Sequence, residues 1–358
     1  MKIKKEIFFY CPILERGGIL TSLAIYANHL SNSHNIKIFT SCIDKSILKK
    51  FDTKIVIINT KKWRGLLSRL ISSFLVILSI SRFLNQKTII FSFQNHLLIL
   101  LTNKIFFKKK ILIRTNSIIP NGKNRLEYKN YNYSFLKKII IRFYSLASHI
   151  ITLSKDNVSY FKSIGISNST CVYNYFKKNK LKRFKVNKKL NIFFIGRFTL
   201  EKDPVFFLQN LIDDKRINIH FVGSGSLENI LKKISDNKKN IFFHPYIENP
   251  FKIFKNKIDL LCITSKYEGI PNVLGEAMSY SIPVLAPEEV GLSRLFLSNG
   301  KFGYLYKLNN PKSFKNKISI IINDYLLAIK KAKKGHASLD RFGYKKTLQI
   351  IDKIICKV

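Results

Sequence analysis

Short runs of uninterrupted apolar residues recur along the 358-residue sequence, and most are followed by a stretch with helical character. Runs such as IFFYCP near the N-terminus and LNIFFIG (190–196) lack polar alternation, so both faces of such a strand are expected to be buried. Continuous apolar strands that alternate with helices are typical of parallel sheets covered by helices on both faces. We therefore expect an α/β protein. With 46% hydrophobic residues, a globally disordered chain is excluded.

The alternation occurs in two regions, separated by a basic stretch without an apolar face, KKNKLKRFKVNKK (177–189). In the first region, strands are expected at IFFYCP and at 35–40, 54–59, 88–93, 111–115 and 149–154, and helices at about 19–30, 65–84, 95–104 and 134–147 and over NVSYFKSIG (157–165). In the second, strands are expected at 190–196, 217–223, 240–246, 259–265, 282–286 and 303–308, and helices at 203–212, 226–234, 249–256, 271–280, about 311–334 and about 338–356. The sequence thus predicts two doubly wound domains, residues 1–180 and 190–335, and a C-terminal helix within 338–358. Ligands of such domains bind at the carboxyl ends of the strands, so a cleft between the domains is the expected site.

The charge is strongly unbalanced, with 63 Lys and Arg against 21 Asp and Glu and a net charge of +42. Such a field attracts polyanions, which include nucleic acid, anionic lipid and phosphorylated substrates. The chain is also crowded with Lys, Ile, Asn and Phe, so a bias toward AT-rich codons is an equally good explanation of the charge. In either case acidic residues are scarce, and a carboxylate within a motif is therefore informative.

The cysteines and the apolar segments of the sequence favour a cytosolic protein. The five cysteines are widely spread, without a CxxC pair or zinc spacing, which favours reduced thiols. The apolar start is short and lacks a small-residue cleavage site, so a first strand explains it better than a signal peptide. The segment LISSFLVILSI (70–80) is too short for the roughly 20 residues that span a bilayer. We expect a buried or interfacial helix there.

The most informative motif is KYEGIPNVLGEAM (266–278), in which two glutamates lie eight positions apart. Glu268 falls in a loop after a predicted strand, and Glu276 falls inside a helix that Pro271 helps to start. Unpaired N–H groups at that helix start suit an anion, while Glu276 is placed to accept hydrogen bonds from sugar hydroxyls. Glu268 could face a hexose. The intervening candidate contacts are Gly269, Ile270, Pro271, Asn272 and Val273. The alternative is an ordinary surface loop followed by an exposed glutamate.

A second motif, GRFTLEKD (196–203), follows a buried strand and precedes a helix. Arg197 can bind phosphate oxygens in a planar fork and Lys202 adds a point charge, so the pair could neutralise a leaving diphosphate without a metal. Solvated basic residues are the alternative. No DxD, HExxH or GxSxG pattern occurs, so we expect no metal and no cofactor. Weaker candidates are Gly17 and Gly18, Gly223 with its neighbours Ser224 and Gly225, and His96, which could instead be a satisfied histidine at a helix start.

Over nearly its whole length the sequence resembles the glycosyltransferases of family 4, on the evidence of GRFTLEKD, HPYIENP (244–250), SKYEGIPNVLGEAM (265–278) and IPVLA (282–286). The resemblance implies a GT-B fold of two Rossmann-like domains, with residues 1–180 on the acceptor side, 190–335 binding the nucleotide sugar, and 338–358 crossing back to the first domain. It implies that Arg197 and Lys202 hold the donor diphosphate. It also implies that Glu268 and Glu276 form the E-x7-E pair, and that Gly17, Gly18, Gly196, Gly223 and Tyr246 lie at the donor.

The same resemblance implies a retaining, metal-independent hexosyl or N-acetylhexosaminyl transfer from a nucleotide sugar, with UDP expected. The acceptor would be a hydroxyl of a lipid-linked or growing surface glycan at the inner face of the cell membrane, and His96 could contact acceptor or sugar. Basic residues of the first domain would face anionic lipid; they are Arg64, Arg69, Lys108, Lys109 and Lys110. The sequence departs from the family at Asp203, where glycine is usual, and at Arg294, where an acid is usual. Alternatives are another GT-B enzyme, such as a sugar-nucleotide epimerase, and a basic nucleic-acid-binding protein, although no RNP-like or zinc-finger pattern supports a nucleic-acid partner.

Overall fold

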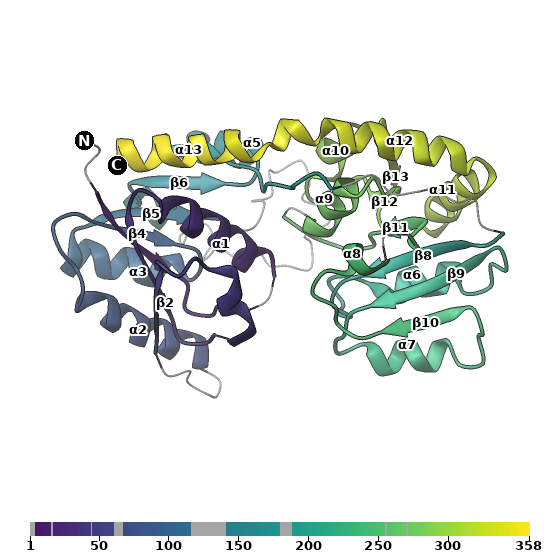
Figure 1. Cartoon of the computed structure of the whole chain (residues 1–358), viewed down its shortest axis with the longest axis horizontal. Helices are drawn as coiled ribbons and strands as arrows, with labels where there is room; N and C mark the ends of the chain where they lie inside the picture. The colour runs from purple at the N-terminus through teal and green to yellow at the C-terminus, as the bar shows by residue number, and fades with distance from the viewer. Residues whose placement is uncertain are drawn as a thin grey trace. The chain divides into compact units, whose positions relative to one another are not determined.

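The structure is a computed structural model of the whole chain. It describes residues 4–15, 17–43, 45–60, 67–115, 141–179, 188–254, 256–269 and 271–358. The chain divides into two compact units, of which the first is Met1–Asn174 with Lys345–Val358 and the second is Tyr175–Tyr344 (Figure 1). Each unit is built on its own sheet, and the two are described separately below.

The first unit is a seven-stranded sheet in the order β3-β2-β1-β4-β5-β6-β7, and every neighbouring pair is parallel. Its strands are β1 (Glu6–Tyr10), β2 (Asn35–Thr40), β3 (Val56–Asn59), β4 (Thr88–Ser92), β5 (Lys110–Arg114), β6 (His149–Thr152) and β7 (Ser169–Cys171). Its helices are α1 (Gly18–Leu30), η1 (Lys45–Lys50), α2 (Ser68–Ser81), α3 (His96–Thr102), η2 (Asn103–Phe107), η4 (Phe143–Leu146), α5 (Lys155–Ser163) and α13 (Tyr344–Lys357).

Strand β1 shows why this sheet is apolar on both sides. Ile7 and Phe9 point into one core, with side chains of α1 and α13, while Phe8 and Tyr10 point into the other, with α2 and α3. The helix α13 therefore joins the first unit although it follows the whole of the second unit in the chain. A hydrogen bond of 2.9 Å between His29 Nε2 and a carboxylate oxygen of Asp352 adds to that packing.

The second unit is a six-stranded parallel sheet in the order β10-β9-β8-β11-β12-β13. Its strands are β8 (Leu190–Ile195), β9 (Ile217–Val222), β10 (Ile241–His244), β11 (Leu260–Cys262), β12 (Val284–Pro287) and β13 (Tyr304–Tyr306). Its helices are α6 (Pro204–Leu211), α7 (Glu228–Ile234), α8 (Pro250–Phe254), α9 (Asn272–Ser279), α10 (Ser293–Phe296), α11 (Pro311–Asn323), α12 (Tyr325–Ala337) and η5 (Ser338–Phe342). Two parallel sheets with helical crossovers confirm the predicted α/β class with two Rossmann-like domains.

Several details differ from the expectations. The single helix expected over about 338–356 is wrong, because the 3-10 turn η5 ends at Phe342, and Gly343, in extended geometry, separates it from α13. The strand β7 has no counterpart among the predicted elements. The single helix expected over 311–334 is wrong, because Asp324 leaves helical geometry and caps α12 by accepting from the backbone N–H of Leu327 at 2.9 Å. The helix α7 begins at Glu228, two residues after Ser226. Of the helix expected over 134–147, residues 134–140 lie outside the described residues, and its end is the 3-10 turn η4.

Among the described residues, no helix combines the length and the apolar character needed to cross a membrane.

Candidate active site at the carboxyl edge of the second sheet

Two glycine-bearing loops are pressed together after β8 and β9. A Cβ at Gly223 would lie 2.0 Å from the carbonyl oxygen of Gly196, and one at Gly225 would lie 2.5 Å from that of Phe198. Gly223 also has φ of +145°, which side chains with a Cβ rarely adopt. The N–H of Phe198 donates to the carbonyl of Ser224 at 2.9 Å. The loop that carries Arg197 is therefore fixed by its neighbour at both ends.

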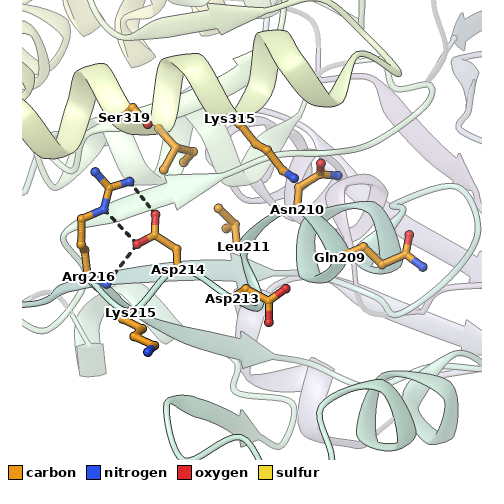
Figure 2. A pocket seen from close by; sticks show the side chains of 10 residues that line it. Gln209, Asn210, Leu211, Asp213, Asp214, Lys215, Arg216, Lys315 and Ser319 are labelled. Atoms are coloured by element: carbon orange, nitrogen blue, oxygen red, sulfur yellow. Dashed lines mark hydrogen bonds and ion pairs between the residues drawn. The ribbon is translucent and has the colours of Figure 1, made fainter.

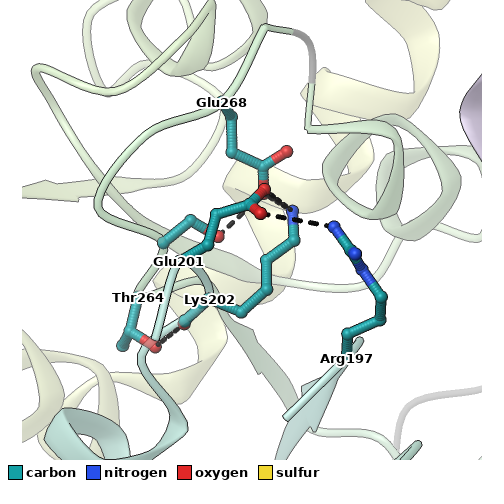
Figure 3. A network of polar contacts seen from close by, with 6 residues as sticks. Arg197, Glu201, Lys202, Thr264 and Glu268 are labelled. Atoms are coloured by element: carbon teal, nitrogen blue, oxygen red, sulfur yellow. Dashed lines mark hydrogen bonds and ion pairs between the residues drawn. The ribbon is translucent and has the colours of Figure 1, made fainter. Parts of the chain in front are cut away.

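Arg197 projects from this fixed loop with 68% of its side chain exposed. Its Nη2 lies 3.3 Å from Oε2 of Glu201, four residues further along (Figure 3). A guanidinium has five N–H donors, so one contact of this kind leaves the planar fork able to bind an anion.

Lys202 meets Glu268 across two neighbouring strands. Strands β8 and β11 are paired in parallel, so the loops at their carboxyl ends lie at the same edge of the sheet. Lys202 Nζ lies 2.5 Å from Oε1 of Glu268 and 3.9 Å from Oε1 of Glu201 (Figure 3). The Glu268 side chain is only 9% exposed, so this ion pair is largely shielded from water. Arg197, Glu201, Lys202 and Glu268 thus form one connected network.

Thr264 and Ser265, which follow β11, belong to the same network, and the sequence analysis missed both. Both are buried. Ser265 Oγ donates to Oε1 of Glu268 at 2.7 Å. Thr264 Oγ1 lies 3.0 Å and 2.9 Å from the carbonyl oxygens of Lys202 and Asp203, and its single proton serves one of them at a time. Their position could have identified them, because both are hydroxyl residues that directly follow the carboxyl end of a buried strand, where ligands of such sheets bind.

The departure from the family pattern at Asp203 has a structural explanation. This residue has φ of +48°, in the left-handed region that favours glycine and that aspartate tolerates. Its carboxylate accepts from the N–H of Phe206 at 3.2 Å and so caps α6. It also pairs with Lys266 Nζ at 3.1 Å. Aspartate therefore keeps the backbone turn and adds two contacts that glycine would lack.

Helix α9 carries Glu276 on its exposed side. The helix is packed closely at the neighbouring position, since a Cβ at Gly275 would lie 2.4 Å from the ring of Phe176. Burial raises the pKa of Tyr280, and the charge of Glu276 adds to that rise. Asn272 and Val273 lie half-buried in the first turn of α9, with Pro271 buried before it, and Ile270 lies outside the described residues.

A third loop, after β12, packs against the Glu268 loop. Gly291 has φ of +58°, and a Cβ there would lie 2.8 Å from the carbonyl oxygen of Gly269 and 3.2 Å from that of Glu268. Arg294, which stands where the family usually has an acid, pairs with Glu288 of the same loop at 3.1 Å. This edge of the second sheet therefore has a cation, Arg294, at a position where the family usually has an acid. The carboxylate of Glu288 holds that cation in place.

The remaining candidates lie elsewhere. In the first unit, Gly17 precedes Gly18, the first residue of α1, and a Cβ at Gly17 would meet nothing within 4 Å. His96 is buried at the start of α3, with Nδ1 2.8 Å from Ser92 Oγ, and burial lowers its pKa to about 4. This geometry fits the satisfied helix-start histidine, and an acceptor contact for His96 stays a prediction. Tyr246, in the second unit, is exposed after β10.

A surface hollow of about 490 Å³ lies between the end of α6, the start of β9 and α11 (Figure 2). It is lined by Gln209, Asn210, Leu211, Asp213, Asp214, Lys215, Arg216, Lys315, Ile318 and Ser319. Hydrogen bonding from Arg216 lowers the pKa of Asp214 at its rim. The hollow adjoins the amino end of β9, whereas the candidate residues follow carboxyl ends of strands, so it is a different place. Within the described ranges, no group of three or more His, Cys, Asp or Glu side chains could hold a metal ion.

Solved structures with the same architecture show which fold the chain has. The structure of Anabaena HepE in complex with UDP and glucose matches with a TM-score of 0.79 at 16% identity, covering 99% of this chain and all of that one. The crystal structure of TarM matches with a TM-score of 0.78 at 14% identity, covering 99% of each chain. Both have the two-sheet arrangement found here, and the fold is that of the GT-B glycosyltransferases.

Residues 176–337 match the family described as Glycosyl transferases group 1. This region makes up most of the second unit, and over it the chain is similar to the enzymes of this family. An uncharacterized glycosyltransferase of Methanocaldococcus jannaschii is 30% identical over 58% of this chain and 59% of its own length. The Campylobacter jejuni GalNAc-alpha-(1->4)-GalNAc-alpha-(1->3)-diNAcBac-PP-undecaprenol alpha-1,4-N-acetyl-D-galactosaminyltransferase is 24% identical over 89% of each chain.

Proposed function

We propose that this glycosyltransferase moves a hexose or N-acetylhexosamine from a UDP-linked donor, with retention at the anomeric carbon, to a hydroxyl of a lipid-linked or growing surface glycan. The observation that carries the proposal is the network of Arg197, Lys202 and Glu268 at the carboxyl edge of the second sheet. Support for the substrates comes from the relatives. The Campylobacter enzyme is named for transfer to a glycan on undecaprenol diphosphate, and HepE was solved with UDP and glucose.

Arg197 and Lys202 are assigned to the donor diphosphate. As the anomeric C–O bond breaks, negative charge builds on the departing diphosphate, and cations that are already in place stabilise that charge most effectively. Arg197 offers an exposed planar fork, and Lys202 is held by Glu268. Binding of the donor would exchange the contact between Arg197 and Glu201 for contacts with phosphate oxygens.

The other residues are assigned to the rest of the donor. Glu276, on the exposed side of α9, would accept hydrogen bonds from the ribose hydroxyls, and the N–H groups of the first turn of α9 would face a phosphate. Glu268 would act chiefly through Lys202, with its remaining oxygen toward the sugar. Further donor contacts are proposed for Gly17, Gly18, Gly196, Gly223, Tyr246, Gly269, Ile270, Pro271, Asn272 and Val273.

The transfer would pass through an oxocarbenium-like state. The acceptor oxygen forms a bond to the anomeric carbon on the face from which the diphosphate departs. The bond from that carbon to the diphosphate oxygen breaks, and the acceptor proton passes to the departing diphosphate. UDP and the extended glycan are the products, and no covalent intermediate with the protein is required. We place the enzyme in the cytoplasm, at the inner face of the cell membrane, with anionic lipid as its surface partner.

The test is a panel of nucleotide sugars added to the purified chain. A donor that binds the folded state raises the melting temperature by mass action. We expect stabilisation by UDP-sugars above that by GDP- and ADP-sugars, and an acceptor-dependent product by mass spectrometry. Conversion of the sugar nucleotide to an epimer without any acceptor would contradict the proposal.

A further inference from the structure

Helix α2 has apolar side chains on its outward side as well as on its inward side. Its buried residues are Ser72, Ser73, Val76, Ile77 and Ile80. Leu70, Phe74 and Leu78 are between 45% and 59% exposed, and Leu67, just before the helix, is exposed as well. Leu70, Phe74 and Leu78 are spaced four residues apart and so lie along one side of the helix. A helix on the surface of a globular protein ordinarily has polar residues on its outward side.

The inward orientation is fixed by hydrogen bonds. Ser73 Oγ donates to the carbonyl of Arg69 at 2.7 Å and accepts from Asn95 Nδ2 at 2.6 Å. Asn95 precedes α3, so this contact ties the two helices together, and Val76 and Ile77 pack in the core that α3 shares. Helix α2 therefore cannot turn Leu70, Phe74 and Leu78 inward without breaking these contacts.

A second exposed apolar group follows α3. Ile105 and Phe106, in the turn η2, are 62% and 72% exposed. Helices α2 and α3 cover the same face of the first sheet (Figure 1), because both line the core that includes Phe8 and Tyr10. Lysines flank the pair at Lys104 and at 108–110.

The part of the sequence that holds these side chains is rich in basic residues and almost without acidic ones. Between Asp52 and Asp156 the sequence contains one acidic residue, Glu127. Arg69, Arg82, Lys104 and Lys108 are exposed in the same part of the chain. Exposed apolar side chains bordered by lysine and arginine match an anionic lipid surface, where the cations meet headgroups and the apolar groups enter the acyl boundary.

We infer that the outward side of α2 (Leu67, Leu70, Phe74 and Leu78), together with Ile105 and Phe106, inserts into the interface of an anionic bilayer. This inference rests on the proposed function, because the proposed lipid-linked acceptor is the reason for choosing a membrane over a soluble partner. Helix α2 has 14 residues, about 21 Å at 1.5 Å per residue, so it lies in the plane of the interface. The membrane contact is thus a specific apolar surface as well as a diffuse charge.

The first experiment is flotation with vesicles of equal parts phosphatidylcholine and phosphatidylglycerol, against vesicles of phosphatidylcholine alone. We expect the wild type to float with the anionic vesicles, and the Phe74→Ser/Leu78→Ser variant to lose affinity by about tenfold or more, because each buried apolar side chain contributes substantially. The matched control is Leu326→Ser, a leucine of α12 in the second unit that is more exposed than Phe74 or Leu78, and this variant should bind as the wild type. Equal flotation of wild type and double variant would overturn the inference.

The second experiment measures insertion in folded protein. In a Trp63→Phe background, which removes the only tryptophan of the sequence, Phe106→Trp should be quenched by lipids brominated on their acyl chains, and Leu326→Trp should not. Concentration-dependent dimerisation of the wild type that Phe74→Ser/Leu78→Ser abolishes would instead assign this surface to a second copy and overturn the inference. Thermal stabilisation by UDP-sugars without vesicles is the separate readout. If UDP-sugars do not stabilise the protein, the proposed function is contradicted, while the vesicle experiment still shows whether this surface binds lipid.

Discussion

Lys202 is held in position from two directions. Glu268 accepts from its ammonium group, and the hydroxyl of Thr264 contacts the carbonyl oxygen of the same residue. Lysine has a long flexible side chain, so these contacts reduce the entropy that is lost when the ammonium group meets a phosphate. Ser265 in turn holds Glu268. The position of the charge that we assign to the donor diphosphate therefore depends on two hydroxyl residues that have no charge of their own.

We predict that Ser265→Ala lowers kcat/KM for the donor by about two- to tenfold, the effect of losing one hydrogen bond worth about 0.5–1.5 kcal/mol. Ser265→Thr should restore most of the rate, because it keeps the hydroxyl. Ser163→Ala, which removes a hydroxyl from α5 in the first unit, is the control and should leave the rate unchanged. A melting temperature equal to wild type with full activity in Ser265→Ala would show that the hydroxyl does not position Glu268.

The sequence predicted which charged residues follow the buried strands, but it did not predict their partners. Arg197, Lys202 and Glu268 each follow a continuous apolar run, and that position is enough to select them. The contact between Lys202 and Glu268 joins loops 66 residues apart, and it depends on the pairing of β8 with β11. A pairing of that kind cannot be read from local pattern, so the sequence analysis, in which Glu268 could face a hexose, did not identify Lys202 as its partner.

At the scale of elements, the loop after β9 has two glycines, Gly223 and Gly225, whose hydrogen atoms face the backbone of the loop after β8. Gly223 and Gly17 make an informative pair, because their φ values are nearly equal, +145° and +147°. A Cβ at Gly223 would overlap the carbonyl oxygen of Gly196, whereas one at Gly17 would enter open space. The two positions therefore share the strain of positive φ and differ in steric room.

We predict that Gly17→Ala destabilises the fold by about 1–3 kcal/mol, from backbone strain alone. Gly223→Ala should cost clearly more, because the loop carrying Arg197 must also move, and it should weaken donor binding. Urea unfolding of both variants measures the difference. Equal destabilisation by the two substitutions would contradict the close approach of the two loops.

Strand prediction succeeded where a strand is long and apolar on both sides. It failed at β7, because Ser169–Cys171 has three half-buried residues and no apolar run. Helix prediction failed for 311–334, because the apolar periodicity continues through Asp324. Only the capping contact from Asp324 to the N–H of Leu327 divides α11 from α12. The apolar run at 70–80 predicted a buried or interfacial helix, but its leucines and serines gave no sign of which side would face outward.

At the scale of the whole molecule, histidines connect stability to pH. Burial is the main cause that lowers the pKa of His96 in the first unit and of His220 in the second to about 4. An unfolded histidine titrates near 6.5, so between pH 6.5 and 4 the unfolded chain binds more protons than the native one. Stability is therefore complete above pH 6.5 and is lost as the pH falls toward 4.

We predict that the free energy of unfolding of the first unit falls by about 3 kcal/mol between pH 7 and pH 4 through His96 alone, at about 1.4 kcal/mol per pKa unit. The variant His96→Gln should have a flatter pH dependence in urea unfolding over this range. His29→Gln, in the same unit, serves as the control, because His29 is partly exposed. The same slope in wild type and His96→Gln would show that folding does not lower the pKa of His96.

The fold class followed from the repeated alternation of apolar runs and helices, which extends over both halves of the chain. The net charge of +42 was compatible with an anionic partner or with codon bias, and it located no surface. The lipid surface proposed here depends on which side of α2 faces outward and on the turn after α3. The orientation of α2 is set by contacts distant in sequence, such as that between Asn95 and Ser73.

The most direct test of the donor site is the rate of sugar transfer by Arg197→Ala and Glu276→Ala, with the preferred UDP-sugar and acceptor. Both side chains are exposed, so the variants should melt with the wild type, and circular dichroism confirms that they are folded. We predict that each substitution lowers kcat/KM by about a hundredfold or more, a typical effect of removing one group that stabilises developing charge or fixes the donor. Transfer at the wild-type rate by both folded variants would contradict the assignment of this edge of the second sheet as the donor site.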